Sequence, residues 1–305
     1  MTAQPAAAAS PQITVKQPPR RGFWQRLATN KLALVGLVSL IALILIAAFG
    51  PLVYAQSATR IDYAAINSLP TADHPLGTDN LGRDALARLM LGLRVSLLVA
   101  LYVEVLNVAL GVTLGLAAGY YGGTIDFIVT RAADMLFAFP GLLLAILVAA
   151  IFGPVVTQQF GSMGRLLLVA GALSLVSWPL MARFVRSQTL VIREQEYITA
   201  ARSLGAGDRH LQRRHVIPHI AGLVITTSTL NVAGVVVNEA ALSLLGLGVQ
   251  PPEPSIGKMI GEAIPYLESN TLQVFLPCLV LMWIVLSVSF LGDGLRDAFD
   301  PQSLR

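Results

Sequence analysis

Two carboxylates inside apolar runs and a group of histidines are the residues of this chain that could do chemistry. Glu104 and Glu239 lie in segments long enough to cross a bilayer, where an ionisable side chain marks a functional site by default. A satisfied hydrogen bond between helices is the alternative explanation for each. His215 and His219 have metal-ligand spacing. However, Pro218 lies between them and no acidic ligand is adjacent, so capping of helix carbonyls is favoured over metal binding.

A polar stripe could accompany the second carboxylate. Asn238 precedes Glu239, and Asn231 lies about two helical turns earlier. Side chains at this spacing fall on related faces of a helix. Asn231, Asn238 and Glu239 are therefore candidates for lining a central path through the bilayer.

The sequence contains no nucleotide-binding or hydrolytic motif. A P-loop needs a Gly-x-x-x-x-Gly-Lys string followed by Ser or Thr, and the three lysines, Lys16, Lys31 and Lys258, lie in no such string. A nucleophile elbow, a His-Glu-x-x-His helix and a kinase signature are absent as well. We expect a chain that is not an enzyme, does not hydrolyse ATP by itself and binds no cofactor or metal.

Long apolar segments must position these residues. Only 12% of the residues are charged, 55% are hydrophobic and the mean hydropathy is +0.68, as in polytopic membrane proteins. A helix needs about 20 apolar residues to cross a bilayer. Six charge-poor windows have about this length, at residues 32–59, 95–125, 135–164, 166–182, 215–238 and 269–292. The sequence therefore predicts an all-α fold with six transmembrane helices.

The basic residues set the predicted orientation. With the N-terminus in the cytosol, the cytosolic segments hold 15 of the 21 Lys and Arg residues, as the positive-inside rule requires. Both termini are then cytosolic, and the basic pI reflects span ends rather than a nucleic-acid partner. We expect a disordered tail at residues 1–22, a first span and external segment at residues 23–94, and a core of five spans at residues 95–305.

The external segment carries an amphipathic pattern. Apolar residues within 81–93 recur at helical spacing, with charged residues on the other face. The pattern predicts a helix capped by Asp79 or Asn80, with Asp84 and Arg88 as an i,i+4 ion pair. Such a helix either lies on the outer surface of the bilayer or receives a substrate or its carrier protein.

A charged segment rich in small residues separates the fourth and fifth windows. Tyr197, Ala201 and Leu204 share one helical face. Ala200 and Ala201 add almost no side-chain bulk, so a partner protein can approach the backbone closely. The pattern predicts a short helix that is presented to something in the cytosol.

The same segment predicts a turn and a second helix. Gly205 lies where a residue in the left-handed conformation ends a helix. Asp208 lies where an N-cap begins the next helix, over residues 209–217, and Pro218 stops or kinks that helix at the membrane boundary. An ordinary amphipathic surface loop is the alternative interpretation.

This segment resembles the Glu-Ala-Ala loop of ABC importer permeases, in the form found in the dipeptide, oligopeptide and nickel permease family. Ala200, Ala201, Gly205 and Pro218 match the family pattern at the right spacing, while Thr199 replaces its Glu, Glu196 lies one turn earlier, and His215 and Ile217 replace its Ile and Leu. Two further strings are similar to that family, His-Pro-Leu-Gly-Thr-Asp at residues 74–79 and Gly-Asp-Gly-Leu-Arg-Asp at residues 292–297. The resemblance covers roughly residues 20–305.

The resemblance implies a type I ABC importer permease fold in a prokaryotic inner membrane. The implied partners are a homologous second permease subunit, two ATPase subunits that bind ATP and Mg, and an extracytoplasmic substrate-binding protein. A loop over residues 186–220 would dock on an ATPase subunit through Glu196, Tyr197, Ala200, Ala201, Arg202, Leu204, Gly205, Asp208 and Pro218. The solute, whether dipeptide, oligopeptide, glutathione or nickel, stays open.

The alternative function is a proton-coupled secondary transporter that uses Glu104 and Glu239. Such transporters are commonly built from inverted repeats with discontinuous helices. No repeat is found in this sequence, so the importer permease is favoured.

Overall fold

The computed structural model describes residues 23–250 and 252–299, and all regular elements among these residues are helices with no strand, as the all-α prediction requires. The expected tail at residues 1–22 lies outside the described residues. Short turns of other helix types occur at Tyr63–Ala65, Gln212–Val216 and Ile264–Tyr266. The α-helices are α1 (Phe23–Thr29), α2 (Lys31–Val53), α3 (Ala85–Tyr121), α4 (Gly123–Phe137), α5 (Gly141–Arg193), α6 (Glu196–Ser203), α7 (Asp208–Leu211), α8 (Ile217–Leu244), α9 (Ile256–Ala263) and α10 (Thr271–Phe299).

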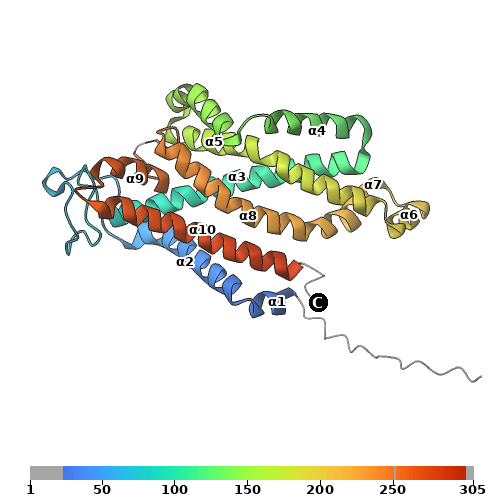
Figure 1. Ribbon diagram of the computed structural model, residues 1–305, viewed down its shortest axis with the longest axis horizontal. Coiled ribbons are helices and arrows are strands. Elements are labelled where there is room, and N and C mark those ends of the chain that lie inside the picture. Colours follow the sequence, from blue (N-terminus) through green and yellow to red (C-terminus); the bar gives the residue numbers. More distant parts are fainter. Residues whose placement is uncertain (1–22, 251, 300–305) are drawn as a thin grey trace, which may run out of the picture.

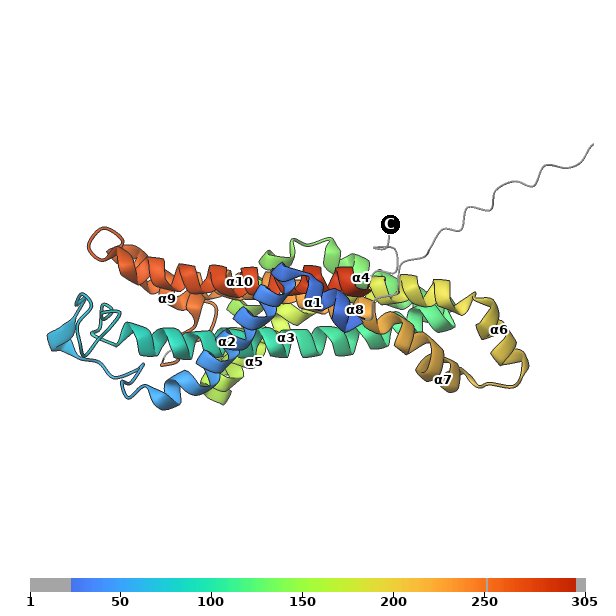
Figure 2. The same cartoon turned by 90° about the horizontal axis from the view of Figure 1, so that it is seen from below.

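The long helices run along one axis of an elongated molecule (Figure 1). Both views place α6 and α7 at one end of this axis, and α9 with residues 55–84 at the opposite end (Figure 2). The two ends of the described chain meet on the α6 side, where the rings of Phe23 and Phe299 lie 4.6 Å apart between centroids. The fold therefore places the loop between α5 and α8 and the segment at residues 55–84 at opposite ends of the long axis.

Five helical runs among the described residues are long and apolar enough to cross a membrane, where the sequence predicts six. The third window begins at the end of α4 and continues into α5, and the fourth lies within the 53 residues of α5. Gly161 interrupts this helix with φ 63°. Arg165 then donates from Nη1 to the Ala149 carbonyl oxygen at 3.1 Å, although sixteen residues of straight helix would separate their backbones by about 24 Å. The two parts of α5 are therefore folded back on each other.

A stripe of glycines brings α3 against the second part of α5. Gly111, Gly115 and Gly119 recur every four residues along α3. A Cβ atom added at Gly115 would lie 2.5 Å from the carbonyl oxygen of Ala182 and 2.9 Å from the Cβ of Val185. Small residues at this spacing allow close helix packing in membranes. The motif is visible in the sequence, but its partner helix is not.

The separate external helix predicted over residues 81–93 is wrong. Asp84 is the N-cap of α3, since its side chain accepts a 2.7 Å hydrogen bond from the backbone N–H of Ala87. The helix then continues without a break to Tyr121. The amphipathic residues form the first turns of α3, so the expected boundary between residues 94 and 95 lies inside one helix.

Candidate functional site

The loop between α5 and α8 contains the helix and turn that the sequence predicts. Helix α6 ends in a Schellman motif. The N–H of Gly205 donates to the Arg202 carbonyl at 2.9 Å, and the N–H of Ala206 donates to the Ala201 carbonyl at 3.1 Å. Gly205 has φ +90°, so the left-handed conformation predicted for it is confirmed.

The loop is attached to the end of α3. Gly207 is the N-cap of α7, not Asp208 as predicted, and no side chain caps this helix. The Asp208 carboxylate instead accepts a 2.8 Å hydrogen bond from the hydroxyl of Tyr120, which also accepts one from Arg202 at 3.3 Å. Arg193 donates to the Tyr120 carbonyl at 3.1 Å. We call these four side chains, Tyr120, Arg193, Arg202 and Asp208, the α3 latch. No pattern in the sequence predicts this set of contacts.

Pro218 does not stop the second helix of the loop. It lies in the first turn of α8, directly after the π turn over Gln212–Val216, where the Ile217 N–H bonds to the Gln212 carbonyl. Proline removes one N–H, and its ring crowds the carbonyl four residues earlier. The wider turn accommodates this, so α7 and α8 form one bent run. His219 Nδ1 lies 2.6 Å from the His215 carbonyl oxygen, in line with the predicted capping.

The outer face of α6 differs from the predicted one. Ala201, predicted to share this face, is half-buried and packs with Ile198 and Leu211 inside the protein. Leu204 is 90% exposed and Tyr197 41% exposed, and Ala200 is exposed as well. Since residues three and four apart share a face, Tyr197, Ala200 and Leu204 form the surface that α6 presents outward.

The predicted polar stripe on α8 is divided between two sides of the helix. Glu239 is fully buried and accepts hydrogen bonds from Ser96 at 2.9 Å and from Ser243 at 2.6 Å. Asn238 is exposed. Adjacent helical residues are about 100° apart, so both cannot line the same path. The buried Glu239 thus makes hydrogen bonds between α3 and α8 within the protein interior.

Asn231 instead pairs with the other intramembrane carboxylate. Its Nδ2 donates to Glu104 at 2.7 Å, and Asn107 donates to the second oxygen of Glu104 at 3.0 Å. Glu104 is 8% exposed. Sequence reasoning singled out Glu104 and Asn231 separately, but their contact depends on the axial register of α3 and α8. A site at this pair is therefore distinct from Glu239.

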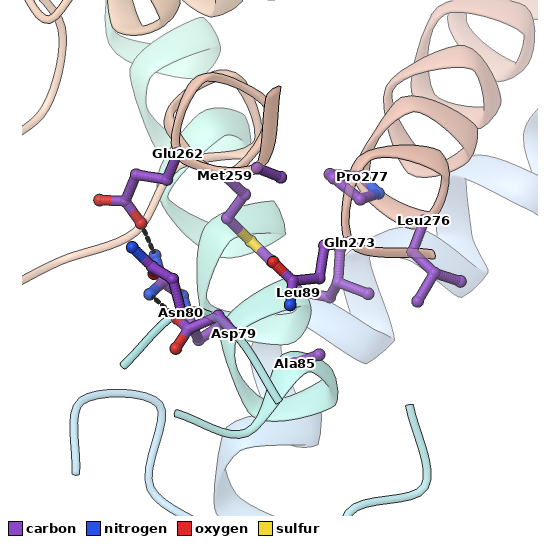
Figure 3. Close-up of a pocket in the computed structure, with 11 residues that line it drawn as sticks. Asp79, Asn80, Ala85, Leu89, Met259, Glu262, Gln273, Leu276 and Pro277 are labelled. Carbon is purple, nitrogen blue, oxygen red and sulfur yellow. Dashed lines mark hydrogen bonds and ion pairs between the residues drawn. The ribbon is translucent and has the colours of Figure 1, made fainter. Parts of the chain in front are cut away.

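At the opposite end of the molecule, an ion-pair network joins α3, α9 and the external segment. Arg88 contacts Asp79 and donates to Glu262 at 2.6 Å, and both carboxylates are labelled in Figure 3. Arg83 donates to the same two carboxylates, at 2.7 Å to Asp79 and at 3.0 Å to Glu262. The predicted pair of Asp84 and Arg88 is wrong, because Asp84 caps α3. The adjacent cavity of about 30 Å³ holds little more than water.

Asp84 also fastens the external segment to the start of α3. It accepts a hydrogen bond from the Tyr54 hydroxyl at 3.1 Å and lies 2.9 Å from His74 Nδ1. Burial and the nearby Asp84 charge raise the pKa of Tyr54 to about 12. Three separate stretches of chain are held at one carboxylate.

Lys258, on α9, carries a charged group that lacks a hydrogen-bond partner within the described part of this end of the molecule. Its ammonium is buried and has no hydrogen-bond partner among the described residues. Burial lowers its pKa to about 8; Glu262 opposes the shift, and Arg88 and Arg83 add to it. The group therefore destabilises the folded state while it remains charged.

Comparison with known families decides the identity of the fold. The family model "Binding-protein-dependent transport system inner membrane component" matches residues 111–305, more than half of the chain. The chain belongs to this family. A second model, "N-terminal TM domain of oligopeptide transport permease C", matches residues 18–70 of the permease. It is a dipeptide/oligopeptide-type ABC permease and therefore a multi-pass inner-membrane protein.

Relatives match the permease over nearly its whole length. The "Dipeptide transport system permease protein DppC" of Alkalihalophilus pseudofirmus is 38% identical, with 95% of this chain and 92% of the relative covered. The "Glutathione transport system permease protein GsiD" of Pectobacterium atrosepticum is also 38% identical, with 93% and 91% covered. The inward-facing MetNI methionine ABC transporter matches with a TM-score of 0.55 and 19% identity over 70% of this chain and 97% of that chain. This last similarity shows the fold alone.

Proposed function

We propose that this permease subunit forms half of the translocation path of an importer for short peptides and couples that path to two ATPase subunits through α6. The observation that carries the coupling is the exposed face of Tyr197, Ala200 and Leu204 on a helix tied to Tyr120 of α3 through Arg202. The exposed apolar side chain of Leu204 lies on the same face as Ala200, which has almost no side-chain bulk. Such a surface can pack closely into a groove of a partner protein. The names of the dipeptide and glutathione relatives support a peptide solute.

The proposed complex pairs this chain with a homologous permease, two ATPase subunits and an extracytoplasmic binding protein. The chain itself binds no cofactor, and ATP and Mg lie on the ATPase subunits. The α6 end faces the cytosol, as the distribution of Lys and Arg favours, and both termini lie on that side. The part of α5 before Gly161 follows α4 and makes the third of six crossings.

The α3 latch and the bent α7–α8 run explain how a movement of α6 reaches the membrane. Tyr120 connects α6 and α7 to α3, and α8 continues from α7 through the π turn. Closure of the ATPases would therefore tilt α3 and α8 together and expose the path alternately to the two sides. The solute must make different contacts in the two states for this cycle to move it. Membership of the ABC permease family replaces the alternative of a proton-coupled secondary transporter.

The docking role is tested by placing one negative charge at two positions of α6. Leu204→Glu puts a carboxylate on the outward face, where docking would bury it without a partner, at a cost of several kcal/mol. Thr199→Glu adds the same residue on an exposed flank of the same helix, at the position where the family pattern has Glu. Both variants are co-expressed with the partner subunits and purified through the ATPase, and then reconstituted to measure ATP-driven peptide uptake.

We expect Leu204→Glu to lose most ATPase association or uptake and Thr199→Glu to retain both. Full association and wild-type uptake by Leu204→Glu would contradict docking through this face. Equal loss in the two variants would instead mean that any added charge disturbs α6.

A further inference from the structure

A cavity of about 800 Å³ lies between α5 and α10 over α8, toward the α6 end. This volume falls within the range of about 300–1,000 Å³ that is typical of small-molecule sites. Its wall is largely apolar but includes five polar side chains, Gln188, Thr226, Thr227, Asn231 and Arg296. The cavity therefore offers both enclosure and a limited set of specific contacts to a ligand.

One end of this cavity carries an unbalanced negative charge. Asn231 lies in the wall, and directly behind it Glu104 accepts the 2.7 Å hydrogen bond from the Asn231 amide. Both oxygens of Glu104 have amide donors, yet no Lys, Arg or His of the described residues lies within ion-pair distance of it. A buried charge is normally paired with an opposite charge, and here the protein supplies none.

The other end carries a positive charge. Arg296 lies in the cavity wall, is exposed and forms no ion pair with the described residues. The position of Arg296 along α8 follows from two contacts between α10 and α8. Gly292 packs against Leu230, and Phe299 packs against Gly222. These contacts place Arg296 opposite Thr226, five residues from Asn231 on α8. Five helical residues correspond to about 7.5 Å along the axis.

The wall between the two charges has spare hydrogen-bonding capacity. Thr226 is 8% exposed, and its hydroxyl has no hydrogen-bond partner among the residues that the structure describes. A buried hydroxyl without a partner is uncommon in folded proteins. A ligand with peptide N–H and C=O groups in the cavity would give this side chain a partner after rotation about χ1.

We propose that this cavity binds a short zwitterionic peptide, with its α-ammonium group at Asn231 and Glu104 and its α-carboxylate at Arg296. Two extended residues span about 7 Å, close to the axial rise of about 7.5 Å between Thr226, the level of Arg296, and Asn231, the level of Glu104. Arginine is suited to carboxylates because its guanidinium donates two parallel hydrogen bonds. The proposal rests on the importer function above and adds the orientation of the solute and the residues that recognise its two ends.

The experiment measures peptide binding to the purified complex of all subunits in nanodiscs, without nucleotide or binding protein. The probes are the dipeptide Ala-Ala, acetyl-Ala-Ala, which lacks the ammonium, and Ala-Ala-amide, which lacks the carboxylate. The variants are Glu104→Gln and Arg296→Gln. Asp293→Asn is the control, because it removes an exposed charge from α10 outside the cavity wall. Thermal unfolding and basal ATP hydrolysis check that each variant is assembled.

We expect Glu104→Gln to weaken Ala-Ala binding at least tenfold, as for a lost charge-assisted contact, and to bind acetyl-Ala-Ala as weakly as the wild type does. Arg296→Gln should weaken Ala-Ala equally and leave binding of Ala-Ala-amide unchanged. Asp293→Asn should match the wild type with all three probes. An equal loss of all three peptides in Glu104→Gln would show a structural role only and overturn the proposal, as would equal binding of the three peptides by the wild type.

Failure of the importer function itself has a different signature. If the wild-type complex with its binding protein shows ATP-driven uptake of a solute that is not a peptide and of no peptide, the proposed coupling to ATPase subunits stands, and the peptide solute and the peptide site are both refuted. If the chain forms no complex with an ATPase subunit, both proposals fail.

Discussion

The hydroxyl of Tyr120, in the last turn of α3, donates a 2.8 Å hydrogen bond to the carboxylate of Asp208, the first residue of α7. Tyr120 is 5% exposed, so water competes little for this contact. The bond connects the loop between α5 and α8 to α3, the helix that carries Glu104.

Removing this hydroxyl should loosen the loop. Tyr120→Phe keeps the ring but leaves Asp208 without its donor, and a hydrogen bond to a charged group contributes about 1.5–3 kcal/mol. We expect faster amide exchange over residues 196–211 and a several-fold lower peptide uptake per ATP hydrolysed. Tyr121→Phe is the control because Tyr121 is adjacent but 54% exposed. Unchanged amide exchange and peptide uptake in Tyr120→Phe would show that the hydrogen bond between Tyr120 and Asp208 does not couple the loop to α3.

The turn after α6 should depend on one glycine and not on its neighbour. Gly205 has φ +90° and nothing within 4 Å of an added Cβ, so Gly205→Val introduces backbone strain without a clash. A left-handed conformation costs a residue with a side chain roughly 1–2 kcal/mol, and more when it is β-branched. Gly207 has φ −73° and equal space. We expect proteolysis within the loop and reduced uptake for Gly205→Val, and near-normal behaviour for Gly207→Val.

The glycine stripe makes the contact of α3 with α5 intolerant of side chains. Gly115→Leu would drive its Cβ to 2.5 Å from a backbone oxygen of α5, so the helices must separate, and overpacking costs about 1–3 kcal/mol or more. Gly171→Leu adds the same side chain inside α5, where nothing lies within 4 Å. We expect a lower melting temperature in detergent for Gly115→Leu alone. Equal melting temperatures in both variants would contradict the packing.

The lowered pKa of Lys258 predicts that the folded state becomes more stable as the pH rises. Its pKa is lowered to about 8 in the folded state from 10.5, so the unfolded state binds more protons between these values. Stability should therefore rise as pH increases from 8 to about 10.5, and the full desolvation penalty applies below pH 8. Lys258→Met should raise the melting temperature at pH 7, by roughly 2–4 °C per kcal/mol removed, and should flatten the pH dependence. Lys31→Met is the control. If the stability of Lys258→Met still rose with pH above 8, a group other than Lys258 would be responsible for the rise.

Topology is checked by cysteine labelling after Cys278→Ser. Tyr63 is 74% exposed in the external segment, and Arg209 is exposed beside α6. An impermeant maleimide added to intact cells should label Tyr63→Cys and spare Arg209→Cys until the membrane is opened. The reverse pattern would invert the proposed orientation.

Local signals in the sequence predicted the features that depend on single residues or on long apolar windows. Gly205 ends α6 as its position after the helix requires, and each charge-poor window lies mostly within one of the long apolar helical runs. The helix expected over residues 81–93 was wrong as a separate element because amphipathic spacing does not show where a helix ends. Asp84 is the actual cap, and Asp79 and Asn80 precede it.

Features that depend on which surfaces meet could not be predicted. Ala201 and Ala200 are chemically identical, and only the packing of Ile198 and Leu211 decides which of them faces inward. Asn231 was grouped with Glu239 by spacing along α8, whereas its partner is on α3. Such pairings depend on the register between helices, which is a property of tertiary packing.

The two polar contacts between α3 and α8 also restrict how these helices can move. Ser96 pairs with Glu239, and Glu104 pairs with Asn231, so each contact lies eight residues from the other on both helices. Sliding one helix along the other by a single residue, about 1.5 Å, would disrupt both hydrogen-bonded contacts at once. We therefore expect the two helices to tilt as one unit without sliding along each other, so that the relative motion of the proposed transport cycle occurs at the outer surfaces of the pair.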